Sequence, residues 1–255
     1  MKVKGPAQDL HSGIFGGMVR NPLQGLSWIL AKLKDENERV LIPHFYDDVK
    51  EFTPAEKKEM GEVPFSEKGI AKEIGVSGLM SEKGFTPLEH NWARPTLDIC
   101  GMWGGYTGVG AKTIIPAEAT AKVSMRLVAN QDPKKIAKFF EDYVKAICPK
   151  GVSVSVELFS VTPPIYVERD HFFLGQVAKA YEQGFGKKMI FKREGASIPV
   201  AAAFQQVLHV PIIFVGLGLP DDRYHSPNEK ISLSNFFGGI RGAALAYEAL
   251  AEKPK

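Results

Sequence analysis

A histidine in the segment DDRYHSPNEK is the first candidate for chemistry. His225 follows an apolar run and a turn rich in glycine and proline, and ligands of open α/β sheets usually bind where strands end. An imidazole beside Asp221, Asp222 and Glu229 could ligate a metal ion, with a carboxylate orienting the ring. The alternative is an ordinary surface histidine in a polar loop.

Two other segments carry groups that suit an anion. The segment REGAS, Arg193 to Ser197, precedes a predicted helix, whose first turn offers free N–H groups and a partial positive charge. Ser197 could donate to a carboxylate there or could simply cap the helix. Arg126 lies on the polar face of a predicted strand, and its guanidinium fork matches a carboxylate. A solvated surface arginine is the alternative.

His11 and Thr113 lie in glycine-containing loops. His11 stands in DLHSGIFGG, where glycines allow the backbone to approach a ligand closely, and Thr113 stands in GAKTIIP. Each signal is weak when taken alone. The chain has no GxSxG serine elbow, and its GGYTGVG segment lacks GxGxxG spacing, so neither a serine nucleophile nor nucleotide binding is favoured.

Composition narrows the class of protein further. The 255 residues are 44% hydrophobic and 24% charged with a net charge of +3, and no block of basic residues indicates nucleic-acid binding. Cys100 and Cys148 cannot form a disulfide framework, which fits a reducing compartment. The N-terminus has no apolar signal-peptide core. The most apolar stretch, 198–220, is interrupted by polar residues and indicates a buried core, so we expect no membrane partner.

The elements expected over residues 1–166 follow the order β-α-β-β-α-β. The six are a strand near Lys2–Pro6, a helix opened by Asn21 and Pro22, strands at Thr96–Met102 and Ala119–Val128, a helix opened by Asp132 and Pro133, and an alternating strand at Val152–Leu158. This order is typical of a ferredoxin-like fold. An insertion of short helices and loops is expected at about 35–94. A boundary is expected near Thr162-Pro163-Pro164.

Residues 167–255 are predicted to form part of an α/β domain with a mostly parallel sheet. The expected elements are a helix capped by Asp170 and ending near Gly186, a strand at Met189–Lys192, a helix at Pro199–Leu208, a strand at Ile212–Gly216 and a helix at Ser234–Ala251. A core of this size would be marginal alone. We therefore expect this region to belong to something larger.

Five segments, taken in order, resemble the M20 metallopeptidases. They are GPAQDLHSGIFGG, GAKTIIP, SMRLVAN, REGASIPV and DDRYHSPNEK, and they are most similar to the cytosolic non-specific dipeptidase and carnosinase branch. The similarity runs from about Val3 to Tyr247. It implies a ferredoxin-like lid (dimerisation) domain at 1–166 and the C-terminal part of an α/β zinc-peptidase catalytic domain at 167–255.

The resemblance also implies roles for the candidate residues. His225 would ligate one ion of a two-metal centre, usually zinc and in some members manganese, beside the substrate. His11 would reach into the partner subunit's active site and stabilise the developing oxyanion, and Thr113 would contact substrate across the same interface. Arg126 and Ser197 would bind the carboxylate end of the substrate, and Glu194 would line that pocket.

The implied activity is hydrolysis of dipeptides by metal-activated water in a cytoplasmic homodimer joined through the lid. The family's H-x-D motif, bridging aspartate and Glu-Glu pair are not present in this sequence. One histidine cannot hold a two-metal centre, so we expect this chain to be inactive alone. The alternatives are an N-acyl amino acid deacylase of the same family and a non-enzymatic dimerisation module.

Overall fold

The computed structural model describes residues 1–193, 198–224 and 226–251. The chain forms two compact units. Unit 1 consists of Met1–Pro164 together with the described residues of the stretch Arg193–Ala202, and unit 2 consists of the remaining described residues. The domain boundary expected after residue 166 stays a prediction. No sequence pattern had indicated that a second stretch of the chain belongs to unit 1.

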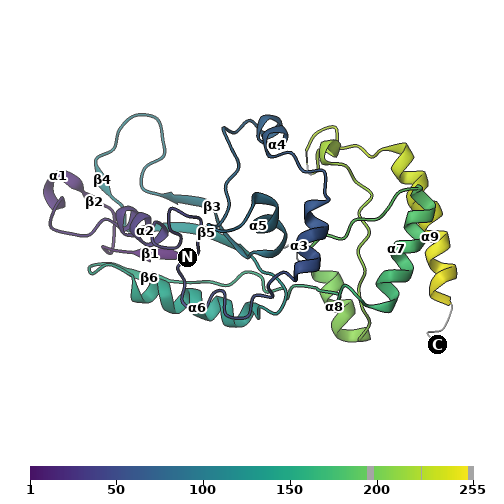
Figure 1. The fold of residues 1–255 in the computed structure, drawn as a ribbon. Coiled ribbons are helices and arrows are strands. Elements are labelled where there is room, and N and C mark those ends of the chain that lie inside the picture. Colours follow the sequence, from purple (N-terminus) through teal and green to yellow (C-terminus); the bar gives the residue numbers. More distant parts are fainter. Residues whose placement is uncertain (194–197, 225, 252–255) are drawn as a thin grey trace. The chain divides into compact units, whose positions relative to one another are not determined.

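Unit 1 is built on a four-stranded sheet. Its strands are β1 (Lys2–Lys4), β3 (Thr96–Gly104), β5 (Glu118–Arg126) and β6 (Ser153–Ser155). Their order is β3-β5-β1-β6, and every neighbouring pair is antiparallel (Figure 1). Because β5 lies between β1 and β3, the first β-α-β unit is split, and the ferredoxin-like prediction is confirmed.

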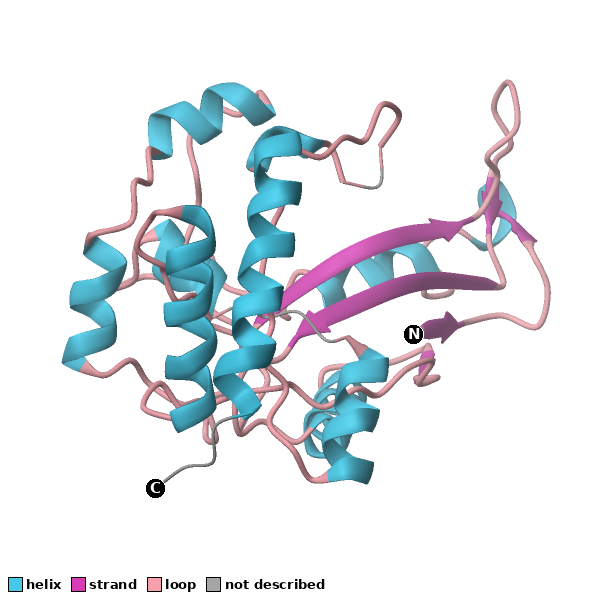
Figure 2. Cartoon of the chain, turned by 90° about the vertical axis from the view of Figure 1, so that its right-hand side faces the viewer, coloured by secondary structure: helices cyan, strands magenta, loops and turns pink. Residues whose placement is uncertain are grey.

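The alternating sequence of β5 determines which face of the sheet is covered. Ala121 is buried, and Val123 and Met125 pack against the hydrophobic core, whereas Lys122 and Arg126 are exposed. Successive side chains of a strand point to opposite faces, so this pattern gives one apolar and one polar face. Figure 2 shows the two long strands, β3 and β5, running side by side.

Two amphipathic helices supply the other half of the core. They are α2 (Pro22–Leu30) and α6 (Pro133–Ala146). The side chain of Asn21 accepts a hydrogen bond from a first-turn N–H of α2 at 2.9 Å, and Asp132 does the same for α6 at 2.8 Å. Both helices also have proline in the first position, which the missing N–H favours. Both helix starts are therefore as predicted.

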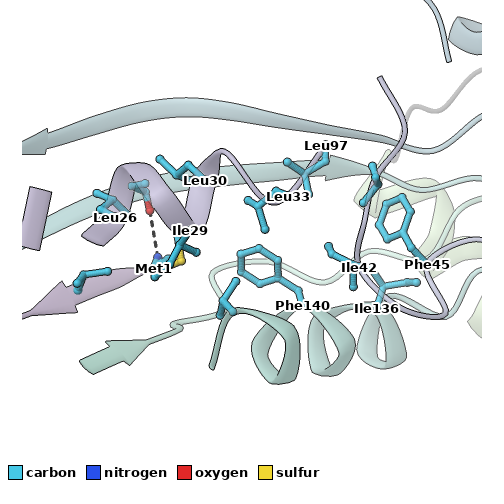
Figure 3. Packing of buried hydrophobic residues seen from close by; sticks show 14 of the residues in the cluster. Met1, Leu26, Ile29, Leu30, Leu33, Ile42, Phe45, Leu97, Ile136 and Phe140 are labelled. Carbon is cyan, nitrogen blue, oxygen red and sulfur yellow. Dashed lines mark hydrogen bonds between the residues drawn. The ribbon is translucent and has the colours of Figure 1, made fainter. Parts of the chain in front are cut away.

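Large apolar side chains from these elements fill the core of unit 1 (Figure 3). Leu26 and Ile29 of α2 are fully buried, and Ile136 and Phe140 of α6 belong to the same cluster. Phe45, from the segment after α2, is also buried there. Each such side chain stabilises the folded state by about 1.5–3 kcal/mol through removal of apolar surface from water.

The last strand of unit 1 is shorter than its alternating pattern predicted. The pattern extends to Leu158, but β6 ends at Ser155. Its only neighbour in the sheet is β1, and the final pair of the register joins Ser155 to Lys2. A strand ends where backbone pairing ends, and the pairing of β6 with β1 does not continue beyond Ser155.

The insertion before β3 contains three short helices, as expected. They are α3 (Pro54–Gly61), α4 (Glu67–Ile74) and α5 (Pro87–Ala93). Helices α3 and α5 each begin with a complete capping box, in which Thr53 or Thr86 exchanges hydrogen bonds with a glutamate three positions later. These local signals fix the helix starts.

A buried ion pair holds the insertion together. Arg94 and Glu82 have side chains that are 5% and 1% exposed, and two hydrogen bonds of 2.8 and 3.1 Å join them. Arg39 donates to the same carboxylate at 2.7 Å, and Arg94 also reaches Glu51 at 2.9 Å. Both guanidinium groups lie over the ring of Tyr46, at 4.5 and 4.7 Å. Glu82 is thus surrounded by cations.

The same cluster makes stability depend on the protonation of His90. Burial lowers the pKa of His90 below its ordinary 6.5; among its charged neighbours, Glu82 and Glu38 raise that pKa while Lys34 and Arg94 lower it. Nδ1 of the ring accepts a hydrogen bond from the backbone N–H of Glu82 at 2.9 Å, which requires an unprotonated nitrogen.

We therefore expect acid to destabilise the fold through His90. The unfolded chain takes up a proton near pH 6.5, whereas the folded chain resists it until lower pH, so the free energy of unfolding falls as pH drops below 6.5. In His90→Asn, an amide oxygen can still accept from Glu82 but cannot titrate. Urea unfolding at about pH 7 and about pH 5 should show that the free energy of unfolding falls less between these pH values in His90→Asn than in the wild type. Equal losses would contradict the assignment.

Two long helices pack together in unit 2. They are α7 (Phe172–Phe185) and α9 (Leu233–Ala251). A Cβ atom on Gly184 of α7 would lie only 2.6 Å from the backbone nitrogen of Gly242 on α9, so the close approach of these helices requires glycine. None of the helices in the described part of the chain is long and apolar enough to cross a membrane.

The helical predictions for this region are confirmed, with one correction. Helix α8 spans Pro199–Leu208, α9 matches the predicted final helix, and α7 ends at Phe185 and is capped by Gly186, whose φ is +67°. The cap of α7 is His171 rather than Asp170. Nδ1 of His171 accepts the hydrogen bond from the first turn at 3.3 Å, one residue later than the sequence indicated.

The two strands predicted for this region were wrong. Residues 189–192 and 212–216 are not strands, and the described part of unit 2 contains no sheet. Both segments are apolar enough for strands, but a strand also needs a neighbour for its backbone groups. Here no described segment pairs with either.

Unit 2 has a thin core, in agreement with the expectation from its length. Its buried hydrophobic residues among those described are Val177, Ala180 and Ala246, whereas Phe214 and Tyr247 are exposed. Small side chains remove little apolar surface from water. Unit 2 therefore has little packing energy of its own.

Candidate functional site

Two of the candidate residues lie next to each other on a small ribbon. Strand β2 (Leu10–His11) pairs antiparallel with β4 (Ile114–Ile115), with His11 opposite Ile114. The chain continues the pairing through a 2.9 Å hydrogen bond from the N–H of Ser12 to the carbonyl oxygen of Thr113. His11 and Thr113, which are far apart in sequence, therefore lie at one place, and both are exposed.

The ring of His11 is oriented by the start of the following helix, α1 (Ser12–Phe15). Nδ1 accepts a hydrogen bond from the N–H of Gly13 at 3.0 Å, so His11 caps this short helix. In the neutral ring the proton must then be on Nε2. No described residue forms a hydrogen bond with Nε2, which leaves an N–H donor available to a ligand.

The ribbon is tied to the main sheet at its base. Oδ1 of Asp9 accepts a hydrogen bond from the N–H of Ala117 at 2.9 Å, and the N–H of Gly5 donates to the carbonyl oxygen of Ala117 at the same distance. These bonds connect the segment before β2 with the segment between β4 and β5. The imidazole of His11 therefore stands on an anchored support.

Arg126 lies at the opposite end of β5 from this ribbon. It is the last residue of that strand, pairs with Thr96 and is exposed. Its guanidinium forms no ion pair with any described residue. Thr113 precedes the start of β5, and the eight steps of about 3.3 Å between the nine residues of this strand separate its two ends by roughly 26 Å. One chain therefore does not bring Arg126 to His11.

Three candidates, Glu194, Ser197 and His225, lie outside the described residues. Near His225 in sequence, Asp221 is exposed and pairs with Lys230 at 2.6 Å, and the hydrogen bond and charge of that lysine lower the pKa of Asp221. Asp222 is only 1% exposed, and its Oδ2 accepts the N–H of Leu219 at 2.6 Å. Of the two aspartates, only Asp222 is buried.

A metal centre needs a cluster of ligating side chains. In residues 1–193, 198–224 and 226–251, no group of three or more histidine, cysteine, aspartate and glutamate side chains gathers closely enough to hold a metal ion. A two-metal centre needs several such ligands. The described residues therefore do not fit one.

Comparison with known proteins decides the family. Residues 1–152, more than half of the chain, match the M20 peptidase dimerisation domain. The chain belongs to the M20 peptidase family. The match includes β1, β3 and β5 of the ferredoxin-like sheet, ends directly before β6, and includes both strands of the ribbon that carries His11.

Several M20 relatives are similar over nearly all of this chain. The Cys-Gly metallodipeptidase of Schizosaccharomyces pombe is 33% identical over 94% of this chain and 51% of its own length, and the human Beta-Ala-His dipeptidase is 29% identical over 99% and 50%. The solved structure of the dipeptidase Dug1p from Saccharomyces cerevisiae superposes with a TM-score of 0.83 at 31% identity, covering 100% of this chain and 54% of that one. The chain thus spans about half the length of the M20 relatives it matches.

One contact near the candidate site was missed by sequence reasoning. Arg193, the first residue of REGAS, forms an ion pair with Glu56 at 2.6 Å. The two residues are 137 positions apart, so no local pattern could indicate the pair. A buried arginine partner could be suspected only from Glu56 lying in a capping box, which is a weak signal.

Proposed function

We propose that this M20 chain is the lid and the C-terminal part of a metal-dependent dipeptidase that hydrolyses dipeptides as a homodimer. The similarity to relatives named Cys-Gly and Beta-Ala-His dipeptidases supports the substrate class. The observation that carries the proposal is the donor geometry of His11, whose Nδ1 is occupied and whose Nε2–H is available.

In this proposal His11 acts on the carbonyl oxygen of the scissile bond. Negative charge develops on that oxygen as the carbonyl carbon becomes tetrahedral, and a fixed N–H donor stabilises it. The hydroxyl of Thr113, on the neighbouring strand, is proposed to bind the substrate backbone. Arg126 is proposed to bind the terminal carboxylate together with Ser197, and Glu194 is proposed to line the same pocket.

The dimensions of unit 1 support a site shared between two copies. A dipeptide extends about 7 Å, at up to 3.6 Å per residue. His11 lies in the ribbon next to the start of β5, and Arg126 is the last residue of β5, so roughly 26 Å of strand lies between the ribbon and Arg126. A single dipeptide can therefore contact both side chains only when they come from different copies. The match to a dimerisation domain supports the same arrangement.

His225 is proposed as a ligand of a two-metal centre that holds zinc or manganese. Such a centre supplies a water of lowered pKa for attack on the peptide bond. The described residues do not provide its other ligands. The test is hydrolysis of Cys-Gly, β-Ala-His and N-acetyl amino acids by the complete protein with either ion. Cleavage of the N-acetyl compounds alone, or of nothing, would contradict a dipeptidase.

Arg126 should control substrate affinity. In the complete protein, Arg126→Ala should raise KM about a hundredfold, because a charged partner of the carboxylate is worth roughly 2–5 kcal/mol. Arg126→Lys should recover only part of this loss, since lysine lacks the two-pronged geometry. Steady-state kinetics on Cys-Gly measures both, with Lys122→Ala on the same exposed face as the control. A KM unchanged in Arg126→Ala would remove the residue from the site.

A further inference from the structure

Arg193 is held by several groups of unit 1 at once. Its Nε and Nη2 atoms donate to one oxygen of Glu56 at 2.9 and 2.6 Å, and its Nη1 donates to the carbonyl oxygen of Lys50 at 2.9 Å. The guanidinium also lies 5.0 Å from the centre of the ring of Phe52. The whole planar group is therefore fixed in position by the segment 50–56.

Glu56 is itself fixed by the start of helix α3. Its Oε2 accepts hydrogen bonds from the backbone N–H and the hydroxyl of Thr53, at 2.8 and 2.9 Å, while its Oε1 binds Arg193. One carboxylate thus closes a capping box with one oxygen and holds an arginine with the other. Thr53 and the helix keep the second oxygen where Arg193 needs it.

This pair is better shielded than a surface ion pair. The side chains of Arg193 and Glu56 are 13% and 14% exposed. Burial by itself would raise the pKa of Glu56, but the hydrogen bonds from Thr53 and Arg193 and the charge of Arg193 lower it overall. The carboxylate is therefore held ionised beside its partner.

The Arg193–Glu56 pair lies at the point where the chain, after residues of unit 2, returns to unit 1. Residues Ile165–Lys192 belong to unit 2, and the second stretch of unit 1 begins at Arg193. The other end of that stretch is held by Ala201 and Ala202, which are buried. Arg193 is thus the anchor at the entry point of this stretch.

The segment that receives Arg193 is tied to the interior of the insertion. Arg193 also approaches the carbonyl oxygen of Glu51 at 3.4 Å, and the side chain of Glu51 accepts a hydrogen bond from the buried Arg94 at 2.9 Å. Arg94 in turn pairs with Glu82. A series of hydrogen bonds, through the backbone and side chain of Glu51, therefore leads from Arg193 to the buried pair of Arg94 and Glu82.

We propose that Arg193 and Glu56 form a positioning pair that sets the entry point of the stretch 193–202 and thereby controls binding of the carboxylate end of the substrate. This inference rests on the proposed function, because Glu194 and Ser197 of that stretch are assigned there to the carboxylate pocket. Arg193 does not touch the substrate in this proposal. Its pairing with Glu56 fixes the first residue of the stretch 193–202.

The first test is amide hydrogen exchange in this chain, which requires no activity. Glu56→Gln keeps an amide oxygen for Thr53 but removes the charge that Arg193 binds. Peptides from 193–202 should exchange at least about tenfold faster in this variant. Glu67→Gln, the same change in the first turn of α4, should leave exchange unchanged. Faster exchange throughout unit 1 would indicate general destabilisation and overturn the proposal.

A double variant tests whether the two residues act as one unit. Arg193→Gln alone should accelerate exchange as much as Glu56→Gln, and the combination should add little, because both changes remove the same interaction. Unchanged exchange in Glu56→Gln, or additive effects in the double variant, would overturn the proposal whether or not the complete protein is a peptidase.

The second test separates a positioning role from a structural one. In the complete protein, Glu56→Gln should raise KM for Cys-Gly several-fold and leave kcat within about twofold. A merely less stable enzyme would lose active molecules and therefore kcat, with KM unchanged, and that result would overturn the link to substrate. Absence of dipeptide hydrolysis in the wild-type protein would overturn the proposed function, while the exchange experiments would still decide the positioning pair.

Discussion

Under the proposed function, replacing His11 by alanine should lower kcat of the complete protein by about two to three orders of magnitude, the usual effect of removing one oxyanion donor. KM should change little, because the donor acts on charge that develops only in the transition state. The reason lies in the ring orientation: Gly13 occupies Nδ1, so the free proton is on Nε2. Initial rates over a range of Cys-Gly concentrations measure both constants.

Two controls accompany this prediction. His44→Ala removes another exposed imidazole, one that pairs with Asp47 in the insertion, and should leave both constants near wild type. Loss of the cap on α1 should cost about 1 kcal/mol at most, which a thermal melt of His11→Ala would reveal. A His11→Ala enzyme with normal kcat and raised KM would show that the imidazole binds substrate without stabilising the transition state.

Removing Glu82 should have the largest effect on stability. Glu82→Leu leaves Arg94 buried without its main partner, and uncompensated buried charges typically cost 3–5 kcal/mol. Urea unfolding of this chain should show that loss. Glu82→Leu combined with Arg94→Met should recover much of it, because the double variant buries no charge in the pair.

An exposed ion pair provides the comparison. Glu118 pairs with Lys2 at 3.1 Å with both side chains largely in solvent, so Glu118→Leu should cost less than about 1 kcal/mol. If Glu82→Leu cost no more than Glu118→Leu, the ion pair with Arg94 would contribute little to the insertion. The same conclusion would follow if the double variant were less stable than either single change.

Much of unit 1 could be predicted because its signals are local. The alternation along β5 and the caps at Asn21 and Asp132 are read from a few neighbouring residues. The order of these elements then indicated the ferredoxin-like sheet. The end of β6 could not be read in the same way, since it depends on backbone pairing with β1, which is far away in sequence.

The errors in unit 2 have the same physical cause. Residues 189–192 and 212–216 have the apolar composition of strands, but composition does not supply a pairing neighbour. The pair of Arg193 with Glu56 is a contact of the opposite kind, clear in the structure and invisible in either local segment. Whether a segment becomes a strand, and whether Arg193 finds its partner, both depend on residues that are distant in sequence.

The candidate site was predictable in part. His11 and Thr113 were singled out separately as weak signals, and the ribbon of β2 and β4 places them together. The separation of Arg126 from this ribbon follows from the length of β5. That separation supports the proposal of a site shared between two copies, which neither residue indicates by itself.

The proposal of a site shared between two copies is tested most directly by mixing two defective proteins. His11→Ala and Arg126→Ala homodimers should each be nearly inactive at substrate concentrations below KM. Coexpressed in equal amounts, they should recover about a quarter of wild-type activity, because half of the dimers are mixed and each mixed dimer holds one intact site. A mixture as inactive as its two components would contradict a site shared between subunits.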